Sequence, residues 1–112
     1  MVEVHWKIWI ERDGRAVFGD GRARLLAAID ATGSLSAAAR ELSIPYRTAW
    51  KHLNSMESGF GRKLVMRRAG GARGGGCRLT RAGRGLLAAY QALREEADAL
   101  LAARSRQFLD GT

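Results

Sequence analysis

Apolar and polar residues alternate over the first ten positions of the chain. The alternating apolar positions are Val2, Val4, Trp6, Ile8 and Ile10. A period of two is typical of a β-strand with one buried face, which places Trp9 on the open face. The pair Asp13-Gly14 then favours a tight turn, and Ala16 to Phe18 can return as a second strand. We therefore predict an N-terminal hairpin over residues 1–19.

The pattern changes to a helical period after this hairpin. Leu25, Leu26 and Ile29 share one face of a first helix. Asp20 is placed to cap the start of this helix, and Gly33 is placed to end it.

Residues 34–57 contain two further helical patterns separated by a short turn. The first, SLSAAARELS, has Ser34 or Ser36 as its N-cap, and its inner face is Ala38, Ala39 and Leu42. The second starts at Pro45, and its buried stripe is Ala49, Trp50, Leu53 and Met56. Only Ser43 and Ile44 lie between the two, so the helices must cross sharply. This arrangement is a helix-turn-helix.

The remaining pattern predicts a hairpin and then a long helix. Residues 63–67 and 77–79 favour two strands, and a hairpin directly after a recognition helix is a wing over residues 63–79. Thr80 can cap a final helix over residues 80–106. The apolar positions of this helix recur at spacings of four and three: Leu86, Tyr90, Leu93, Ala97 and Leu100. The stripe could simply pack on the core, but its length favours an intersubunit seam.

The length and charge limit what this fold can do. A chain of 112 residues fits one domain, which is mainly α with small β-hairpins. Its net charge of +8 and its isoelectric point near 11.0 imply a polyanionic partner. Nine of its nineteen basic residues lie between positions 58 and 94, where there is no Asp or Glu. We therefore expect a local positive field, as nucleic-acid binding requires.

The glycine-rich run at residues 70–76 lies within this basic region. A phosphate-binding P-loop would need Lys and then Ser or Thr where this chain has Gly76 and Cys77. No dinucleotide-binding frame fits the run either. A flexible linker stays open as an alternative. Since Arg68, Arg73 and Arg78 surround or interrupt the glycines, we favour a wing loop that brings cations to phosphates or into a minor groove.

Other function classes find little support in the residues. The single cysteine, Cys77, excludes an internal disulfide, and the two histidines show no metal-site spacing. No acid, base and nucleophile converge, so we expect neither an enzyme nor a cofactor. No signal peptide or membrane span is present, which predicts a cytoplasmic protein without membrane contact.

Two segments of the chain resemble a known family. The runs GSLSAAARELSIPYRTAWKHLNSME and LVMRRAGGARGGGCRLTRAGRGLL are similar to the N-terminal DNA-binding domain of the ModE family of molybdate-responsive transcriptional regulators. The LysR family is related through the AAARELS pattern but lacks the glycine-rich wing. The resemblance covers about residues 17–93 and implies a winged helix-turn-helix that dimerises through its first and last helices.

The resemblance also implies roles for individual residues. The positions that match the DNA-facing part of the motif are Ser43, Tyr46, Arg47, Thr48 and Lys51, and Arg73 matches the wing tip. Ser36, near a helix N-terminus, can hold a phosphate. In the family the molybdate site lies in separate C-terminal domains, and the chain ends at Thr112 without them. We expect either a free-standing regulator, served by a separate effector-binding protein if any, or part of a longer one.

We therefore predict a homodimeric, sequence-specific double-stranded DNA-binding repressor with a roughly palindromic operator. Two alternatives stay open at this point. One is a nucleic-acid-binding or architectural protein without sequence choice. The other is a protein-interaction module built on the last helix.

Overall fold

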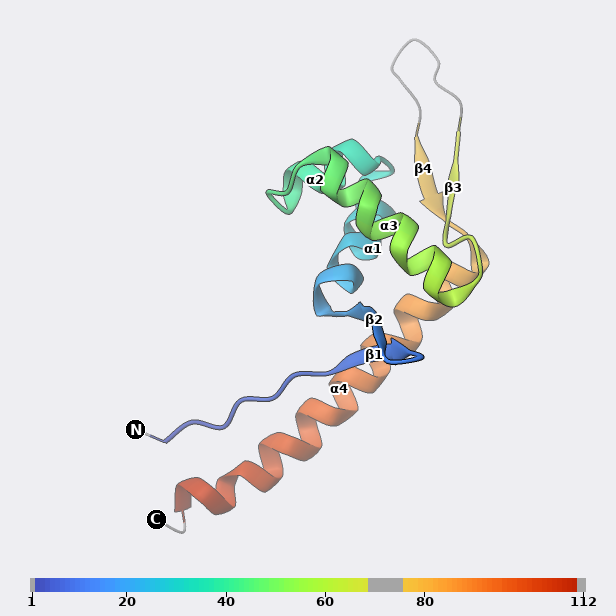
Figure 1. The fold of residues 1–112 in the computed structure, drawn as a ribbon. Helices are drawn as coiled ribbons and strands as arrows, with labels where there is room; N and C mark the ends of the chain where they lie inside the picture. The colour runs from blue at the N-terminus through green and yellow to red at the C-terminus, as the bar shows by residue number, and fades with distance from the viewer. Residues whose placement is uncertain (1, 69–75, 111–112) are drawn as a thin grey trace.

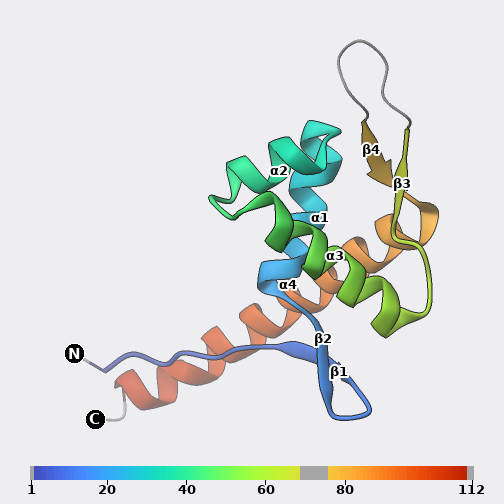
Figure 2. The same ribbon diagram turned by 45° about the horizontal axis from the view of Figure 1, so that its top comes forward.

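The structure, a computed structural model, describes residues 2–68 and 76–110, and within them four helices and two two-stranded antiparallel sheets (Figure 1). The elements are β1 (Trp9–Arg12), β2 (Arg15–Gly19), α1 (Asp20–Thr32), α2 (Leu35–Glu41), α3 (Tyr46–Phe60), β3 (Val65–Arg67), β4 (Cys77–Leu79) and α4 (Arg81–Asp110). The predicted class, mainly helical with small hairpins, is confirmed. The helix-turn-helix of α2 and α3 is followed by the β3–β4 hairpin, which is the wing (Figure 2).

The hydrophobic core lies where the first three helices pack together with both hairpins. The residues at its centre have 0% exposure: Leu26, Ile29, Ala38, Ala49 and Met56. These positions belong to the helical stripes that the sequence predicts. Since Ala38 on α2 and Ala49 on α3 are small, the two helices can cross closely.

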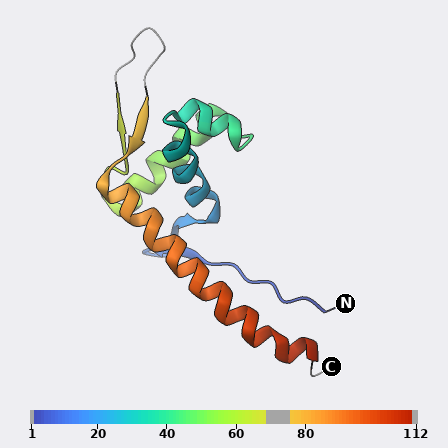
Figure 3. The same cartoon turned by 180° about the vertical axis from the view of Figure 1, so that it is seen from behind.

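The N-terminal hairpin is shorter than predicted. Its strands cover residues 9–12 and 15–19, and Asp13 and Gly14 adopt the positive φ angles of a tight turn, 52° and 78°. Residues 2–8 have no strand opposite them, because β2 ends where α1 begins. They run alongside α4 instead (Figure 3). The alternation predicted for this segment therefore reflects packing on a helix rather than pairing in a sheet.

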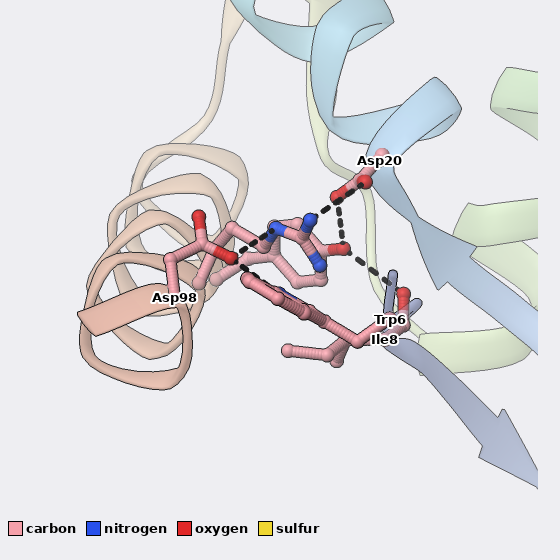
Figure 4. Close-up of polar contacts among 6 residues, drawn as sticks. Trp6, Ile8, Asp20 and Asp98 are labelled. Atoms are coloured by element: carbon pink, nitrogen blue, oxygen red, sulfur yellow. Dashed lines mark hydrogen bonds and ion pairs between the residues drawn. The ribbon is translucent and has the colours of Figure 1, made fainter. Parts of the chain in front are cut away.

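The prediction that Asp20 caps α1 is wrong, because the N-cap is the preceding glycine. The Asp20 carboxylate instead accepts a hydrogen bond of 2.5 Å from the Tyr90 hydroxyl and lies 3.9 Å from Nη2 of Arg94 (Figure 4). Nε of Arg94 lies 3.4 Å from Asp98, which also accepts a 2.7 Å hydrogen bond from the indole N–H of Trp6. This polar network ties both α1 and the N-terminal segment to α4.

Helix α4 projects beyond the rest of the fold, and the structure with this helix included measures 62 Å along its longest axis (Figure 1). It runs from residue 81 to residue 110, slightly further than the predicted 80–106, and Thr80 Oγ1 accepts a 3.0 Å hydrogen bond from the N–H of Gly83 as the predicted cap. Leu93 and Leu100 are 46% and 61% exposed. The outer half of α4 therefore presents apolar side chains away from the core.

Tyr90 belongs to the core of its own chain, which corrects its place in the predicted seam. It is only 3% exposed, and its ring meets that of Phe18 edge-on at 5.1 Å between centroids. Its hydroxyl lies 3.2 Å from the carbonyl oxygen of Ile8. Burial, together with the hydrogen bond to Asp20, raises the pKa of Tyr90 to about 12. The residues of the stripe that are open to a partner are thus fewer than the spacing suggests.

Gly83 allows the first turn of α4 to lie against the chain entering the wing. A Cβ atom at this position would overlap the carbonyl oxygen of Leu64, which accepts a 2.9 Å hydrogen bond from the Thr80 N–H. We expect Gly83→Ala to lower the free energy of unfolding by about 1–3 kcal/mol, because backbone would have to move. Chemical denaturation at fixed protein concentration measures this change.

Gly85 supplies the matched control for this substitution. It lies two residues further along the same helix, and a Cβ atom there would meet no heavy atom of the described residues within 4 Å. Gly85→Ala is expected to stabilise the helix by about 0.5–1 kcal/mol. Equal effects of the two substitutions would contradict the close packing of α4 on Leu64.

Candidate nucleic-acid interface

The turn between α2 and α3 has the geometry of a helix-turn-helix. Ser34 precedes α2, and its side chain accepts a 3.1 Å hydrogen bond from the N–H of Ala37, so Ser34 rather than Ser36 is the cap. Ser43 adopts a positive φ of 57°, and the N–H of Ile44 bonds back to the carbonyl of Ala39 at 3.0 Å. Together these features reverse the chain within a few residues and direct α3 across α2.

The outer side of α3 is polar, exposed and basic at its N-terminal end. Tyr46 is 49% exposed, Arg47 and Lys51 are exposed, and Thr48 is partly buried. Since these residues lie at i, i+1, i+2 and i+5 from the start of the helix, they surround its first turn and the beginning of its second. Four of the five motif positions singled out by the resemblance thus lie together. The fifth, Ser43, is exposed in the preceding turn.

The wing hairpin has a defined inner and outer face. Val65 pairs with Leu79 and Arg67 with Cys77, whereas Met66 pairs with Arg78 between them. Because side chains alternate along a strand, Val65 and Arg67 share the face turned toward the core, and Arg78 lies with Met66 on the opposite face. Val65 is 6% exposed and Met66 50%.

The base of the wing is joined to both helices of the motif. The N–H of Cys77 donates a 2.8 Å hydrogen bond to the carbonyl of Gly33, just before α2. The guanidinium carbon of Arg67 lies 3.3 Å from the ring centroid of Trp50 on α3. Trp50 is partly buried and packs against the core, whereas the other positions of the predicted stripe, Ala49, Leu53 and Met56, are buried. The residue types alone carry no signal of the contact between Arg67 and Trp50.

A shallow groove of about 230 Å³ lies between α2, α3 and the wing base. Its lining residues are Ser34, Leu35, Ser36, Tyr46, Arg67, Arg68, Gly76 and Cys77. Ser36 and Arg68 are exposed at its edges, and the Arg68 N–H donates to the carbonyl of Gly76 at 2.8 Å. Arg73, the predicted wing tip, lies outside the described residues. The groove offers hydroxyls and guanidinium groups to an anionic backbone.

Two titratable side chains of the motif and the wing, His52 on α3 and Cys77 on β4, have shifted pKa values. Burial raises the pKa of the Cys77 thiol, although the backbone at Leu35 and the charge of Arg67 act in the opposite direction. The thiol therefore stays protonated, as a packing residue would be and a nucleophile would not. Burial, and then the charges of Arg22 and Lys51, lower the pKa of His52.

The described ranges 2–68 and 76–110 contain neither a metal-site cluster nor a membrane-spanning helix. Within them, His, Cys, Asp and Glu side chains do not gather in groups of three that could hold a metal ion. None of the helices in these ranges has the length and apolar character that a bilayer span requires.

The geometry of the two helices and the wing agrees with a known family of proteins. The family model of the bacterial regulatory helix-turn-helix proteins, lysR family, matches residues 21–84, which are the three helices of the core, the wing and the start of α4. The chain belongs to this family. Its residues 21–84 are the part that matches the helix-turn-helix of these bacterial regulatory proteins.

Curated relatives of this chain include ModE proteins and their homologues. The chain is 46% identical over 84 residues to the molybdenum-pterin-binding protein MopB of Rhodobacter capsulatus, covering 75% of this chain and 31% of that protein. It is 39% identical over 74 residues to the DNA-binding transcriptional dual regulator ModE of Escherichia coli K12, covering 66% and 28%. The chain thus spans about a third of the length of these relatives. The predicted resemblance to the ModE family is confirmed.

Solved structures of lysR-type regulators share the fold. The DNA-binding domain of CbnR, solved in a complex with DNA, has a TM-score of 0.61 and 25% identity, covering 80% of this chain and 95% of that one. ArgP from Mycobacterium tuberculosis has a TM-score of 0.57 and 30% identity over 79% of this chain and 31% of its own. The winged helix-turn-helix is therefore the fold of this chain.

Proposed function

We propose that this regulator binds double-stranded DNA in a sequence-specific manner, as a homodimer on a roughly palindromic operator. The observation that carries the proposal is the start of α3, where Tyr46, Arg47 and Lys51 are exposed beside the base of the wing. An α-helix fits the major groove of B-DNA, and long basic or aromatic side chains on its first turns can reach the base edges. Repression is the proposed outcome, since a bound dimer can block transcription by occupancy alone.

Arg47 is the proposed reader of a base. It is the second residue of α3, and its guanidinium group can donate two parallel hydrogen bonds to O6 and N7 of guanine. The other three exposed or partly exposed residues would each contact either a base edge or a phosphate: Tyr46, Thr48 and Lys51.

The remaining basic and hydroxyl groups are proposed as phosphate contacts. Ser36 and Arg68 lie at the groove between α2 and the wing, and Ser43 lies in the turn before α3. Arg78 is exposed on the outer face of the hairpin, away from α3, so we assign it to a neighbouring part of the DNA backbone. Contacts of this kind position the protein but carry no sequence information directly.

The homodimer is proposed to form along the outer half of α4. Leu93 and Leu100 are exposed there at a spacing of seven, with Ala97 between them and Leu86 near the core end, partly buried like Ala97. Two copies of this stripe related by a two-fold axis would cover each other's apolar side chains. Such a dimer places two recognition helices on the same face of the DNA.

Arg73 tests the role of the wing. We expect Arg73→Ala to weaken binding to all duplex sequences alike and to make the salt dependence shallower by up to about one unit, because one phosphate contact is lost. Fluorescence anisotropy over a series of salt concentrations measures both quantities. Unchanged affinity together with an unchanged salt slope would contradict a DNA-contacting wing.

The second candidate function is nucleic-acid binding without sequence specificity. It is favoured by the dense positive charge between residues 58 and 94. Competition between a selected duplex, a scrambled duplex and a structured RNA at physiological salt separates the two candidates. We expect the selected duplex to compete at least 10³-fold better than the scrambled one. Equal competition by all three nucleic acids would reject sequence-specific binding.

A further inference from the structure

We propose that Arg67 is a positioning residue for DNA recognition, which holds the recognition helix and the wing in one fixed arrangement by stacking on Trp50. The inference rests on the proposed function, because it assumes that α3 reads DNA. It assigns Arg67 a role that differs from that of the other arginines in the basic region, which supply charge.

The strand register directs Arg67 toward α3. It shares the inner face of the hairpin with Val65, which is 6% exposed, and it pairs with Cys77, which is anchored to the carbonyl of Gly33. Val65 lies at the edge of the core, and the next residue on the same face of the hairpin, Arg67, lies beside α3. A long side chain is needed to bridge the space to α3, and the guanidinium group reaches the face of the Trp50 ring at 3.3 Å.

Trp50 also contacts a residue at the end of α3 that is proposed to face DNA. Tyr46 lies one turn before Trp50, and the two rings meet edge-to-face, with centroids 6.4 Å apart and an interplanar angle of 83°. Tyr46 is also 49% exposed. The order Arg67, Trp50, Tyr46 thus runs from the wing base through the side of α3 to a side chain proposed to contact DNA.

This stack explains why arginine rather than lysine suits position 67. A planar guanidinium stacks on an aromatic face and still has N–H groups at its rim, whereas an ammonium is a strongly hydrated point charge. Arg67→Lys therefore keeps the charge and removes the planar stack. The substitution separates positioning from simple attraction to phosphate.

Arg106→Lys is the matched control, because it makes the same chemical change at an exposed position of α4 outside the proposed DNA contacts. Affinities of both variants and of the unsubstituted protein are measured for the selected operator and for a scrambled duplex, over a series of salt concentrations. For Arg67→Lys we expect the ratio of the two affinities to fall about two- to fivefold, with the salt slope unchanged. We expect Arg106→Lys to leave the ratio unchanged.

Repeating Arg67→Lys in a variant that lacks the tryptophan tests whether the loss of discrimination depends on Trp50. In Trp50→Leu, whose fold is checked by thermal unfolding, Arg67→Lys is expected to cause no further loss of discrimination. Three results would overturn the inference: an unchanged ratio in Arg67→Lys, an equal loss for both duplexes with an altered salt slope, or the same loss in the Trp50→Leu background. If the unsubstituted protein does not discriminate between the duplexes, the proposed function fails instead.

Discussion

Replacing Leu100 by glutamate is expected to convert the proposed homodimer into monomers and to weaken binding to a two-half-site operator by about 10²- to 10⁴-fold. Leu100 is 61% exposed on the outer half of α4, so the substitution leaves the core of the chain intact. In a two-fold dimer it places two carboxylates against each other in an apolar seam. The loss in affinity is large because each half-site then has to be bound separately. Light scattering after gel filtration gives the mass, and anisotropy gives the affinity.

Ala102→Glu is the control for added charge on the same helix. Ala102 is exposed two residues further along, which places it on nearly the opposite side of α4 from Leu100. We expect this variant to stay dimeric and to bind the operator as the unsubstituted protein does. A dimeric Leu100→Glu variant, or loss of the dimer in both variants, would show that the seam is elsewhere.

Arg47→Ala is expected to remove the preference for one base pair in each half-site. The lost discrimination should be about 1–3 kcal/mol, because a bidentate contact to guanine distinguishes that base from the other three. Arg47 is exposed at the second position of α3, so little change in stability should accompany the loss. Affinities for a set of operators with every base at each position locate the pair that Arg47 reads.

Arg106→Ala is the control for the loss of one positive charge, because it removes such a charge near the end of α4. This variant should retain the full base preference. Arg47→Lys complements it, because it retains the charge but cannot form the guanidinium fork. If Arg47→Lys keeps the preference that Arg47→Ala loses, the contact is electrostatic rather than bidentate.

The arrangement of helices and wing follows from local sequence patterns. The period of apolar residues locates α1, α2 and α3, and the short spacer after Glu41 requires a sharp turn. Thr80 marks the start of α4, and the Asp13-Gly14 pair marks the first hairpin. Each of these signals acts over a few neighbouring residues, which is why the sequence alone predicts them.

The contacts that were not predicted connect residues far apart in the chain. Asp20 has the right type and place for an N-cap, but Tyr90 and Arg94 reach it from α4. Trp6 has the period of a sheet residue and bonds to Asp98 instead. No local pattern records which helix will lie beside a given side chain, so these contacts, like that of Arg67 with Trp50, need the structure.

Selection from a pool of randomised duplexes tests the central claim most directly. The full chain is incubated with the pool at physiological salt, and the retained DNA is sequenced. We predict an enriched palindrome whose half-sites lie one helical turn of about 34 Å, or a small multiple of it, apart. Retained DNA without an enriched motif, or with a single unrepeated half-site, would contradict a homodimer that reads DNA with α3.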